Sequence, residues 1–254
     1  MIFRRIKAHV EKENWFAVGI DFCIVVIGVF IGIQVANWNE ARANSAKERI
    51  ILAAILEDIE DDLSNLNTAF ESAALATNVT NDLLVSADLD PLTEFKLPVA
   101  NSTLTATDTL ISELQDTNAE QPWAAITIRY YPSQADAAFA GVVTAGDLSI
   151  ISNLELANDL QRYRALWKAV EISQVDTFRP FRDRLVFVGQ EFGLSPFKDI
   201  EEDELIALIE QNPEFEGAVR TVQEYGILHW QALTTLRDDA EALAAELREE
   251  LERT

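Results

Sequence analysis

A single carboxyl group, Asp21, lies inside a strongly apolar segment near the N-terminus of this 254-residue chain. The segment runs from Phe16 to Ala36 and contains one further strongly polar side chain, the amide Gln34, and no base. A carboxyl group in hydrocarbon costs a few kcal/mol, so it is expected to face protein or water, or to be protonated. Such a residue can carry a coupling ion or form a hydrogen bond to a neighbouring helix, and the sequence leaves both functions open.

Two glycines share a helical face with this carboxyl group. Steps of seven and eleven residues lead from Asp21 to Gly28 and Gly32, and the same face continues to Val35 and Asn39. A GxxxG pair lets two helix backbones approach closely, so the pattern predicts packing against a second span, either another copy or a partner. The alternative is that the glycines are incidental and that Asp21 reaches toward the lipid headgroups.

A cluster of bases forms a second candidate site in an otherwise acidic chain. Its members are Arg162, Arg164, Lys168, Arg179, Arg182 and Arg184. Such a cluster can bind an anionic ligand or a lipid headgroup. It can also pair with acidic helices of the same chain or of another protomer, and we favour this pairing because it requires no ligand.

Other residues that commonly carry chemistry are scarce. The chain has one cysteine, Cys23, and two histidines, His9 and His229, which excludes an intrachain disulfide and a multi-cysteine zinc site. His229 has no nucleophile or ligand partner nearby in the sequence, so we expect it to serve in packing. No phosphate-binding loop and no GxGxxG, GxSxG or HExxH motif occurs. The sequence therefore predicts a protein that is not an enzyme and that uses no cofactor.

An acidic cluster lies on a long predicted helix. It comprises Glu57, Asp58, Glu60, Asp61 and Asp62. The cluster lacks the glycine-bearing loop of known Ca²⁺ sites, so we expect a solvated face and no metal. Across the chain, 43 acids against 20 bases give a formal net charge of −23, which argues against nucleic acid as a partner.

The apolar segment is long enough to cross a membrane once. Its 21 residues extend about 30 Å as a helix, and Trp15 and Trp38 bracket it where aromatic rings favour the two water interfaces. A signal peptide is the competing interpretation, because Ala41-Arg42-Ala43 resembles a cleavage site, yet signal h-regions have only about 7–15 residues. We therefore expect an uncleaved transmembrane helix over residues 15–38, with the lipid bilayer as a partner.

Charges flanking the span indicate its orientation only slightly. Four bases precede the span and three follow it closely, namely Arg4, Arg5, Lys7 and Lys12 against Arg42, Lys47 and Arg49. This bias favours an N-terminus inside the cell. We expect residues 1–14 in the cytoplasm and residues 39–254 in the periplasm, in a single-pass protein of a bacterial inner membrane. The absence of cysteine beyond the span is compatible with an oxidising compartment.

Two stretches resemble an uncharacterised bacterial family of single-pass membrane proteins. The first comprises Val26-Ile27-Gly28, Gln34 and Asn37-Trp38-Asn39-Glu40-Ala41-Arg42. The second extends from Ala138 to Leu148 and continues with Asn153-Leu154-Glu155-Leu156 through Tyr163. The family usually has Glu at the position of Asp21 and Asn at that of Ala36. The resemblance implies a membrane anchor and a helical extracytoplasmic domain, and it supplies no activity.

The residues after the span predict an all-α bundle whose first helix continues directly out of the membrane. No Gly or Pro occurs from Ala41 to Ala87, and apolar or small residues alternate steps of four and three. That predicted stripe is Leu52, Leu56, Ile59, Leu63, Leu66, Phe70, Ala73, Thr77, Thr80 and Leu84.

Shorter elements follow in the sequence. They are a loop over 88–102, a short helix with Leu104, Ile111 and Leu114, an extended segment over 126–130, a helix from Ser133 or Asp136 toward Gly146, a helix opened by Ser152-x-x-Glu155 that Pro180 kinks or ends, a helix after Asp199, and a last helix from Pro213.

Three functions are compatible with these features. We favour an oligomeric interaction or scaffold protein that presents a periplasmic bundle to a partner in the cell envelope. The second is an ion-coupled subunit, because Ile20-Asp21-Phe22 in a single span resembles flagellar stator and biopolymer-transport proteins, whose aspartate carries the coupling ion. The third is a ligand-sensing bundle, which would need a partner for output because only about 14 residues precede the span.

Overall fold

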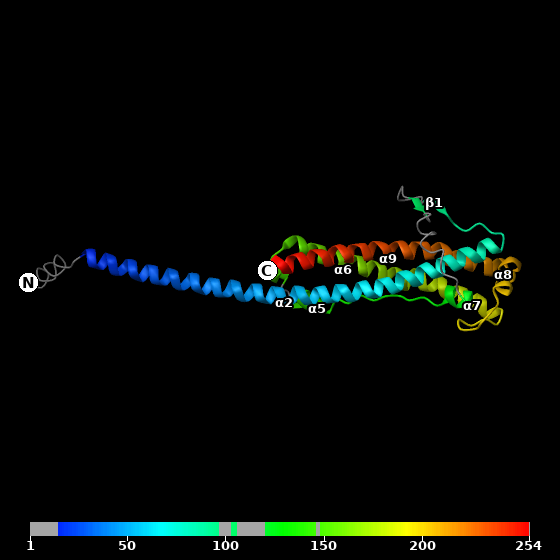
Figure 1. Ribbon diagram of the computed structural model, residues 1–254, viewed down its shortest axis with the longest axis horizontal. Coiled ribbons are helices and arrows are strands. Elements are labelled where there is room, and N and C mark those ends of the chain that lie inside the picture. Colours follow the sequence, from blue (N-terminus) through cyan, green and yellow to red (C-terminus); the bar gives the residue numbers. More distant parts are fainter. Residues whose placement is uncertain (1–14, 97–102, 106–119, 146–147, 254) are drawn as a thin grey trace, which may run out of the picture. The chain divides into compact units, whose positions relative to one another are not determined.

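The computed structural model describes residues 15–96, 103–105, 120–145 and 148–253 (Figure 1). The chain divides into two units, Met1–Ile50 and Ile51–Arg253. Nearly all secondary structure in the described residues is helical, which confirms the all-α class. The exception is a single antiparallel pair of three-residue strands, β1 (Glu94–Lys96) and β2 (Thr103–Thr105), in which Phe95 pairs with Leu104.

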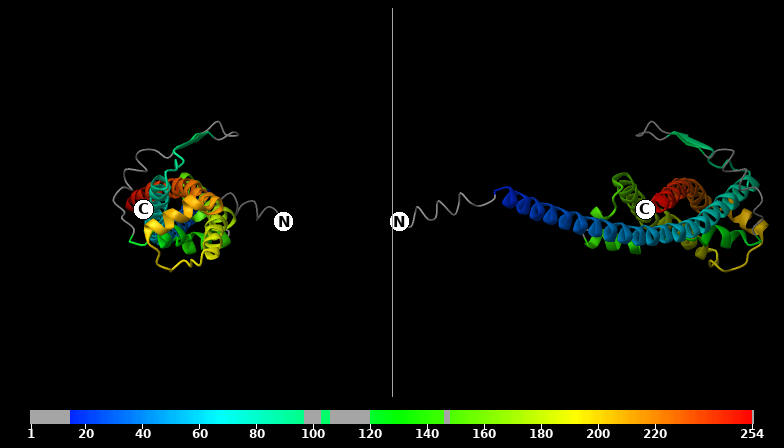
Figure 2. Two further views of the ribbon diagram at one scale, coloured as in Figure 1. Left: turned by 90° about the vertical axis from the view of Figure 1, so that its right-hand side faces the viewer. Right: turned by 60° about the vertical axis from the view of Figure 1, so that its left-hand side comes forward.

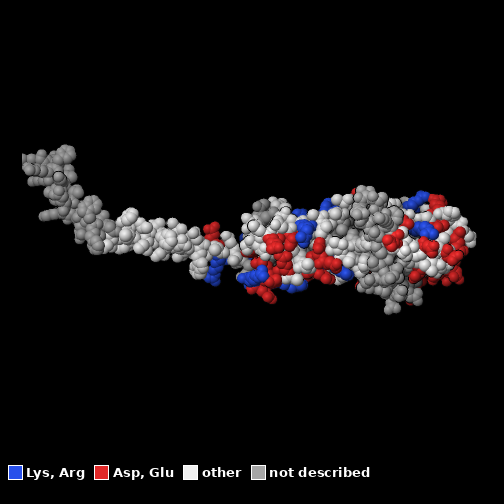
Figure 3. All heavy atoms as spheres, turned by 90° about the horizontal axis from the view of Figure 1, so that it is seen from above, with Lys and Arg blue, Asp and Glu red and all other residues white. Residues whose placement is uncertain are grey.

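The helix α2 runs without a break over Trp15–Ser86, as the absence of Gly and Pro after the span predicts. Within the first unit, the stretch of α2 from Phe22 to Val35 is apolar and uncovered, since its large apolar side chains are 47–68% exposed. No charged residue occurs from Phe22 to Trp38, and Figure 3 shows the uncharged surface of this stretch. By length and composition, one helix among the described residues is able to cross a membrane, and it is α2.

The second unit is a bundle built on long helical segments, two of which, joined by a single turn, follow each other end to end (Figures 1 and 2). The long segments are α2 from Ile51 onward, α6 (Leu154–Ser173), α7 (Arg179–Glu191) and α9 (Pro213–Arg253). A π-helical turn, η2 (Gln174–Phe178), joins α6 to α7. Shorter helices complete the unit, namely α4 (Pro122–Thr127), α5 (Ala137–Ala145), the 3-10 turn η1 (Leu148–Ile150) and α8 (Glu202–Gln211).

The bundle has two apolar cores. The first contains Leu52 and Leu66 of α2, Trp167 of α6 and Leu233 of α9, together with neighbours on the same helices. The second contains residues of α2, α4, α7, α8 and α9, among them Leu84, Trp123, Leu185, Leu205 and Phe215.

A layer of buried polar side chains separates the two cores. On each long helical path, these side chains lie between the residues of one core and those of the other. Its fully described members include Thr77 of α2, Gln174 of η2, and Gln223 and His229 of α9, each at most 3% exposed. The hydrophobic interior of the bundle is therefore interrupted at the level of this polar layer, which also contains the π-helical turn.

The buried seam of α2 differs in part from the predicted stripe. Its residues are Leu52, Ile55, Ile59, Asp62, Leu66, Ala69, Ala73, Ala76, Thr77, Thr80, Leu83, Leu84 and Ala87. The predicted members Leu56, Leu63 and Phe70 are only partly buried. The alternation of three and four residues is correct, but Asp62 occupies a core position and breaks the apolar pattern on which the prediction relied.

Prolines at the start of three segments behave differently from one another. Pro122 lies in the first turn of α4, so Ile126 is helical and the extended segment predicted from it is wrong there. Pro213 begins α9, as predicted. Pro180 lies in the first turn of α7 and does not end the helical path, because the preceding turn widens and the Arg179 amide donates to the carbonyl of Gln174.

Several predicted helix starts shift by one or two residues. Asn153, not Ser152, caps α6, and its Oδ1 accepts the amides of Glu155 and Leu156 at 3.1 and 3.2 Å. The helix α8 follows Glu201 rather than Asp199. The predicted helix toward Gly146 is present as α5, after Asp136.

The predicted short helix with Leu104, Ile111 and Leu114 is wrong at Leu104, which lies in β2. Ile111, Leu114 and Gly146 lie outside the described residues.

Candidate functional site

The predicted membrane face lies entirely within α2. Asp21, Gly28, Gly32 and Gln34 are helical, and so are Trp15, Trp38 and Asn39. No atom lies within 4 Å of the position that a Cβ would take at Gly28 or Gly32. Trp38 is 64% exposed, and Gln34 and Asn39 are exposed. The glycine face is therefore open from Gly28 to Asn39 and free to receive another helix.

The six clustered bases do not form one site. Arg162 pairs with Asp159, Arg164 with Asp136 and Lys168 with Glu171, at 3.0, 3.0 and 3.4 Å. Arg184 pairs with Glu214 of α9. The Arg179 guanidinium lies 4.8 Å from the ring centre of Tyr131.

Five of these bases thus have an acidic partner, the fifth being Arg182 with Asp183 at 2.8 Å. Three of these pairs join residues of the same helix, whereas Arg164 and Arg184 pair with acids of other segments. Two grooves border the cluster: one of about 630 Å³ includes Arg164 and Lys168, and one of about 400 Å³ includes Lys168 and Arg179.

Two members of the acidic cluster attach Ala135 and the first turn of α5 to α2, and the expectation of a solvated face is wrong for Asp62. Asp62 is fully buried and accepts the Ala135 amide at 2.6 Å and the Tyr163 hydroxyl at 2.9 Å. Asp58 accepts the Ala138 amide at 2.8 Å. Burial raises the pKa of Asp62 to about 7, although the hydrogen bonds oppose this shift.

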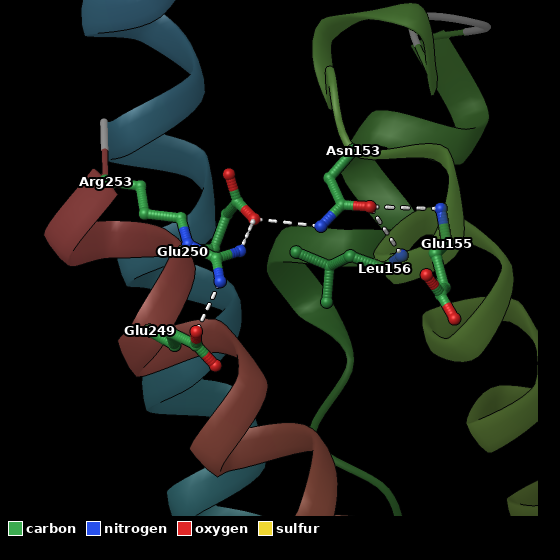
Figure 4. A network of polar contacts seen from close by, with 6 residues as sticks. All are labelled: Asn153, Glu155, Leu156, Glu249, Glu250 and Arg253. Atoms are coloured by element: carbon green, nitrogen blue, oxygen red, sulfur yellow. Dashed lines mark hydrogen bonds and ion pairs between the residues drawn. The ribbon is translucent and has the colours of Figure 1, made fainter.

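A second polar network, which the sequence does not predict, lies where α9 ends beside the start of α6 (Figure 4). Glu250 is 8% exposed and accepts the side-chain amide of Asn153 at 2.8 Å. Arg253 lies 3.6 Å from Glu250 and also pairs with Glu249. Asn153 therefore caps α6 and attaches it to α9. Ion pairs of Arg253 with Glu249 and Glu250 complete the network at this end of the bundle.

The most unusual group of the polar layer is Arg129. Its Nε and Nη2 atoms are buried and form no hydrogen bond, and no acid of the described residues pairs with it. Burial lowers the pKa of Arg129, and the nearby charge of Arg182 lowers it further. Arg182 donates from Nη1 to the Thr127 carbonyl at 3.3 Å, whereas its Nε faces Asp183 at an angle that makes no hydrogen bond.

His229 lies next to this arginine and is fully buried. Its ring packs against Phe178 at 4.6 Å and Tyr131 at 5.5 Å between centres, which confirms the expected packing role. Burial lowers the pKa of His229 to about 3, with a smaller contribution from Arg129. Within the part of the chain that the structure describes, its two ring nitrogens, the Tyr131 hydroxyl and the Gln174 Nε2 atom have no hydrogen-bond partner.

These features describe a bundle protein with one uncovered apolar helix and a buried, positively charged polar layer. The sequence model of DUF6090, a family of unknown function, matches residues 21–133. The match begins at Asp21 and extends over the rest of α2 to the segment that carries Arg129 and Tyr131. No curated protein and no solved structure matches the chain. The match fits the expectation of an uncharacterised family.

Proposed function

We propose that this protein is a membrane-anchored interaction protein without enzymatic activity. In this proposal, residues 15–38 cross a bacterial inner membrane once, and the bundle of the second unit binds another protein of the cell envelope. The observation that carries the proposal is the uncovered apolar stretch of α2, where every large apolar side chain from Phe22 to Val35 is exposed. A lipid bilayer would remove this surface from water, at a gain of roughly 25 cal/mol per Å².

The bundle then lies in the periplasm and residues 1–14 in the cytoplasm. The slight excess of bases before the span supports this orientation.

We further propose that the span assembles through the face of Gly28 and Gly32. Both positions are open, so a second helix can approach the backbone closely. In a parallel homodimer, Val35 lies on this face, whereas Ile33 lies about 140° away from Gly28 around the helix. Both side chains are about half exposed, which makes them a matched pair of probes.

Disulfide cross-linking in membranes tests this assembly. Cys23, the single cysteine, is first replaced by alanine, and Val35→Cys or Ile33→Cys is then introduced. We expect Val35→Cys to give a cross-linked dimer several-fold more readily than Ile33→Cys. Adding Gly28→Leu should reduce the dimer several-fold, because the larger side chain separates the backbones. Val26→Leu, on the opposite side of the helix, is the control.

Equal cross-linking at positions 33 and 35, or a dimer unaffected by Gly28→Leu, would contradict the proposed face. The same face also carries Asp21, which favours ion coupling as a second candidate function. Isolation of the complex in mild detergent separates the two functions. A homo-oligomer supports the interaction protein, whereas a fixed ratio with a multi-span protein supports an ion-coupled subunit.

A further inference from the structure

A small cavity lies in the polar layer, beside the unpartnered arginine. Its walls are formed by Arg129, Phe178, Phe181, Arg182, Val222, Tyr225 and Gly226. The cavity has a volume of about 10 Å³. That volume suffices for about one particle of the size of a water molecule and excludes a phosphate or a carboxylic acid.

Of the described residues, two cations, Arg129 and Arg182, line this cavity and no acid does. The Nε and Nη2 donors of Arg129 are buried there without an acceptor. The acid next to Arg182 is Asp183, but its side chain is 48% exposed and its attraction is screened by water. A buried guanidinium without a counter-charge is unfavourable, and a second guanidinium nearby increases the cost.

The other groups around Arg129 do not neutralise it. Burial lowers the pKa of His229 to about 3, so at pH 7 the ring is neutral. Burial raises the pKa of Tyr131, so its hydroxyl group also stays neutral. Among the described residues, Arg182 therefore has the half-exposed Asp183 as its partner, whereas the charge of Arg129 has no acidic counter-charge.

Glycine at position 226 keeps room for the arginine. A Cβ there would lie 2.6 Å from Thr77 Oγ1 and 3.2 Å from Arg129 Nη2. The Thr77 hydroxyl already donates to the Ala73 carbonyl at 2.8 Å, so it has little freedom to withdraw. Aromatic rings close the remaining wall, where the tilted rings of Phe181 and Tyr225 lie 4.2 Å apart between centres. The positive edges of such rings are favourable neighbours for an anion.

We propose that this cavity binds one monatomic anion, chloride, between Arg129 and Arg182. The anion accepts the unpartnered N–H groups of Arg129 and supplies the missing counter-charge. Because the site joins the segment after α4 to η2, α7 and α9 between the two cores, its occupancy stabilises the folded bundle. This inference does not depend on the proposed function, since it concerns the interior of the second unit.

Thermal unfolding of the full-length protein in detergent tests the site. The buffer contains gluconate as its anion at pH 7.5, and chloride, bromide or sulfate replaces gluconate at constant ionic strength. We expect chloride and bromide to raise Tm saturably, by roughly 3–6 °C at ten times the dissociation constant, with no such rise in sulfate. Arg129→Gln should abolish the rise. Arg184→Gln, which removes the same charge from an exposed site, should preserve it.

Several results would overturn the proposal. One is a wild-type Tm that is equal in chloride and gluconate, which is the result expected if water occupies the cavity. Others are a sulfate-induced rise that Arg129→Gln abolishes, or loss of the chloride effect in Arg184→Gln. If Arg129→Gln does not fold, Arg182→Gln replaces it in the thermal unfolding experiment. In that case ³⁵Cl NMR of the wild-type protein provides a second test, and an unbroadened ³⁵Cl signal would contradict binding.

Discussion

Two buried titratable residues, Asp62 and His229, make opposite contributions to stability in weak acid. The pKa of Asp62 is raised from 3.8 to about 7, so its contribution is fully present below pH 3.8 and is lost as the pH rises through 7. The pKa of His229 is lowered from 6.5 to about 3, so its contribution is present above pH 6.5 and is lost as the pH falls through 3. Between about pH 4 and 6.5 the two effects oppose each other.

Single substitutions should therefore reveal how Asp62 and His229 each change the pH dependence of the free energy of unfolding. Relative to wild type, Asp62→Asn should make the free energy of unfolding rise with pH between 4 and 6.5, by up to about 1.4 kcal/mol per pH unit. His229→Gln should produce a slope of opposite sign. Urea unfolding at several pH values measures both, and the difference from wild type removes the contribution of other acids. A pH profile of Asp62→Asn that parallels the wild type would contradict the assignment.

At the scale of the elements, the contact between α7 and α4 depends on a glycine. A Cβ at Gly189 would lie 2.5 and 2.6 Å from two ring carbons of Trp123. The tryptophan has little room to move, because it is 1% exposed and its Nε1 donates to the Ser195 carbonyl at 2.8 Å. The close approach of α7 to α4 therefore requires the absence of a side chain at position 189.

Gly189→Ala should destabilise the protein by about 1–3 kcal/mol, the usual cost of overpacking. Gly217→Ala is the matched control, because α9 leaves open space at that position and alanine favours a helix there by roughly 0.5–1 kcal/mol. Chemical unfolding of the two variants compares them directly. If Gly189→Ala were as stable as Gly217→Ala, the packing described for Trp123 would be wrong.

The sequence predicts the elements well where one helix dominates. The length of α2 and the start of α9 follow from the positions of Gly and Pro and from a repeat of three and four residues. The predicted seam of α2 lacks Ile55 and Asp62, because the sequence pattern does not distinguish a buried carboxyl group from a solvent-facing one. Local rules also missed the π-helical turn, which lets the helical path pass Pro180.

At the scale of the molecule, predictability falls with the distance along the chain between interacting residues. The glycine face of α2 is local and can be seen in the sequence. The polar layer is not local, since it joins Thr77, Arg129, Gln174 and His229 from separate elements. No periodicity relates these residues, so their meeting emerges only from the packed bundle. The anion site was accordingly outside the reach of sequence analysis.

The central claim is that the apolar stretch of α2 is an uncleaved anchor in a membrane. Alkaline carbonate extraction of membranes that contain the full chain, followed by intact mass measurement of the pellet, tests it most directly. If the segment is an uncleaved anchor, a full-length species of 28.4 kDa should stay with the lipid fraction. A carbonate-soluble species that begins after Ala43 would contradict it and would show that the segment is a cleaved signal peptide.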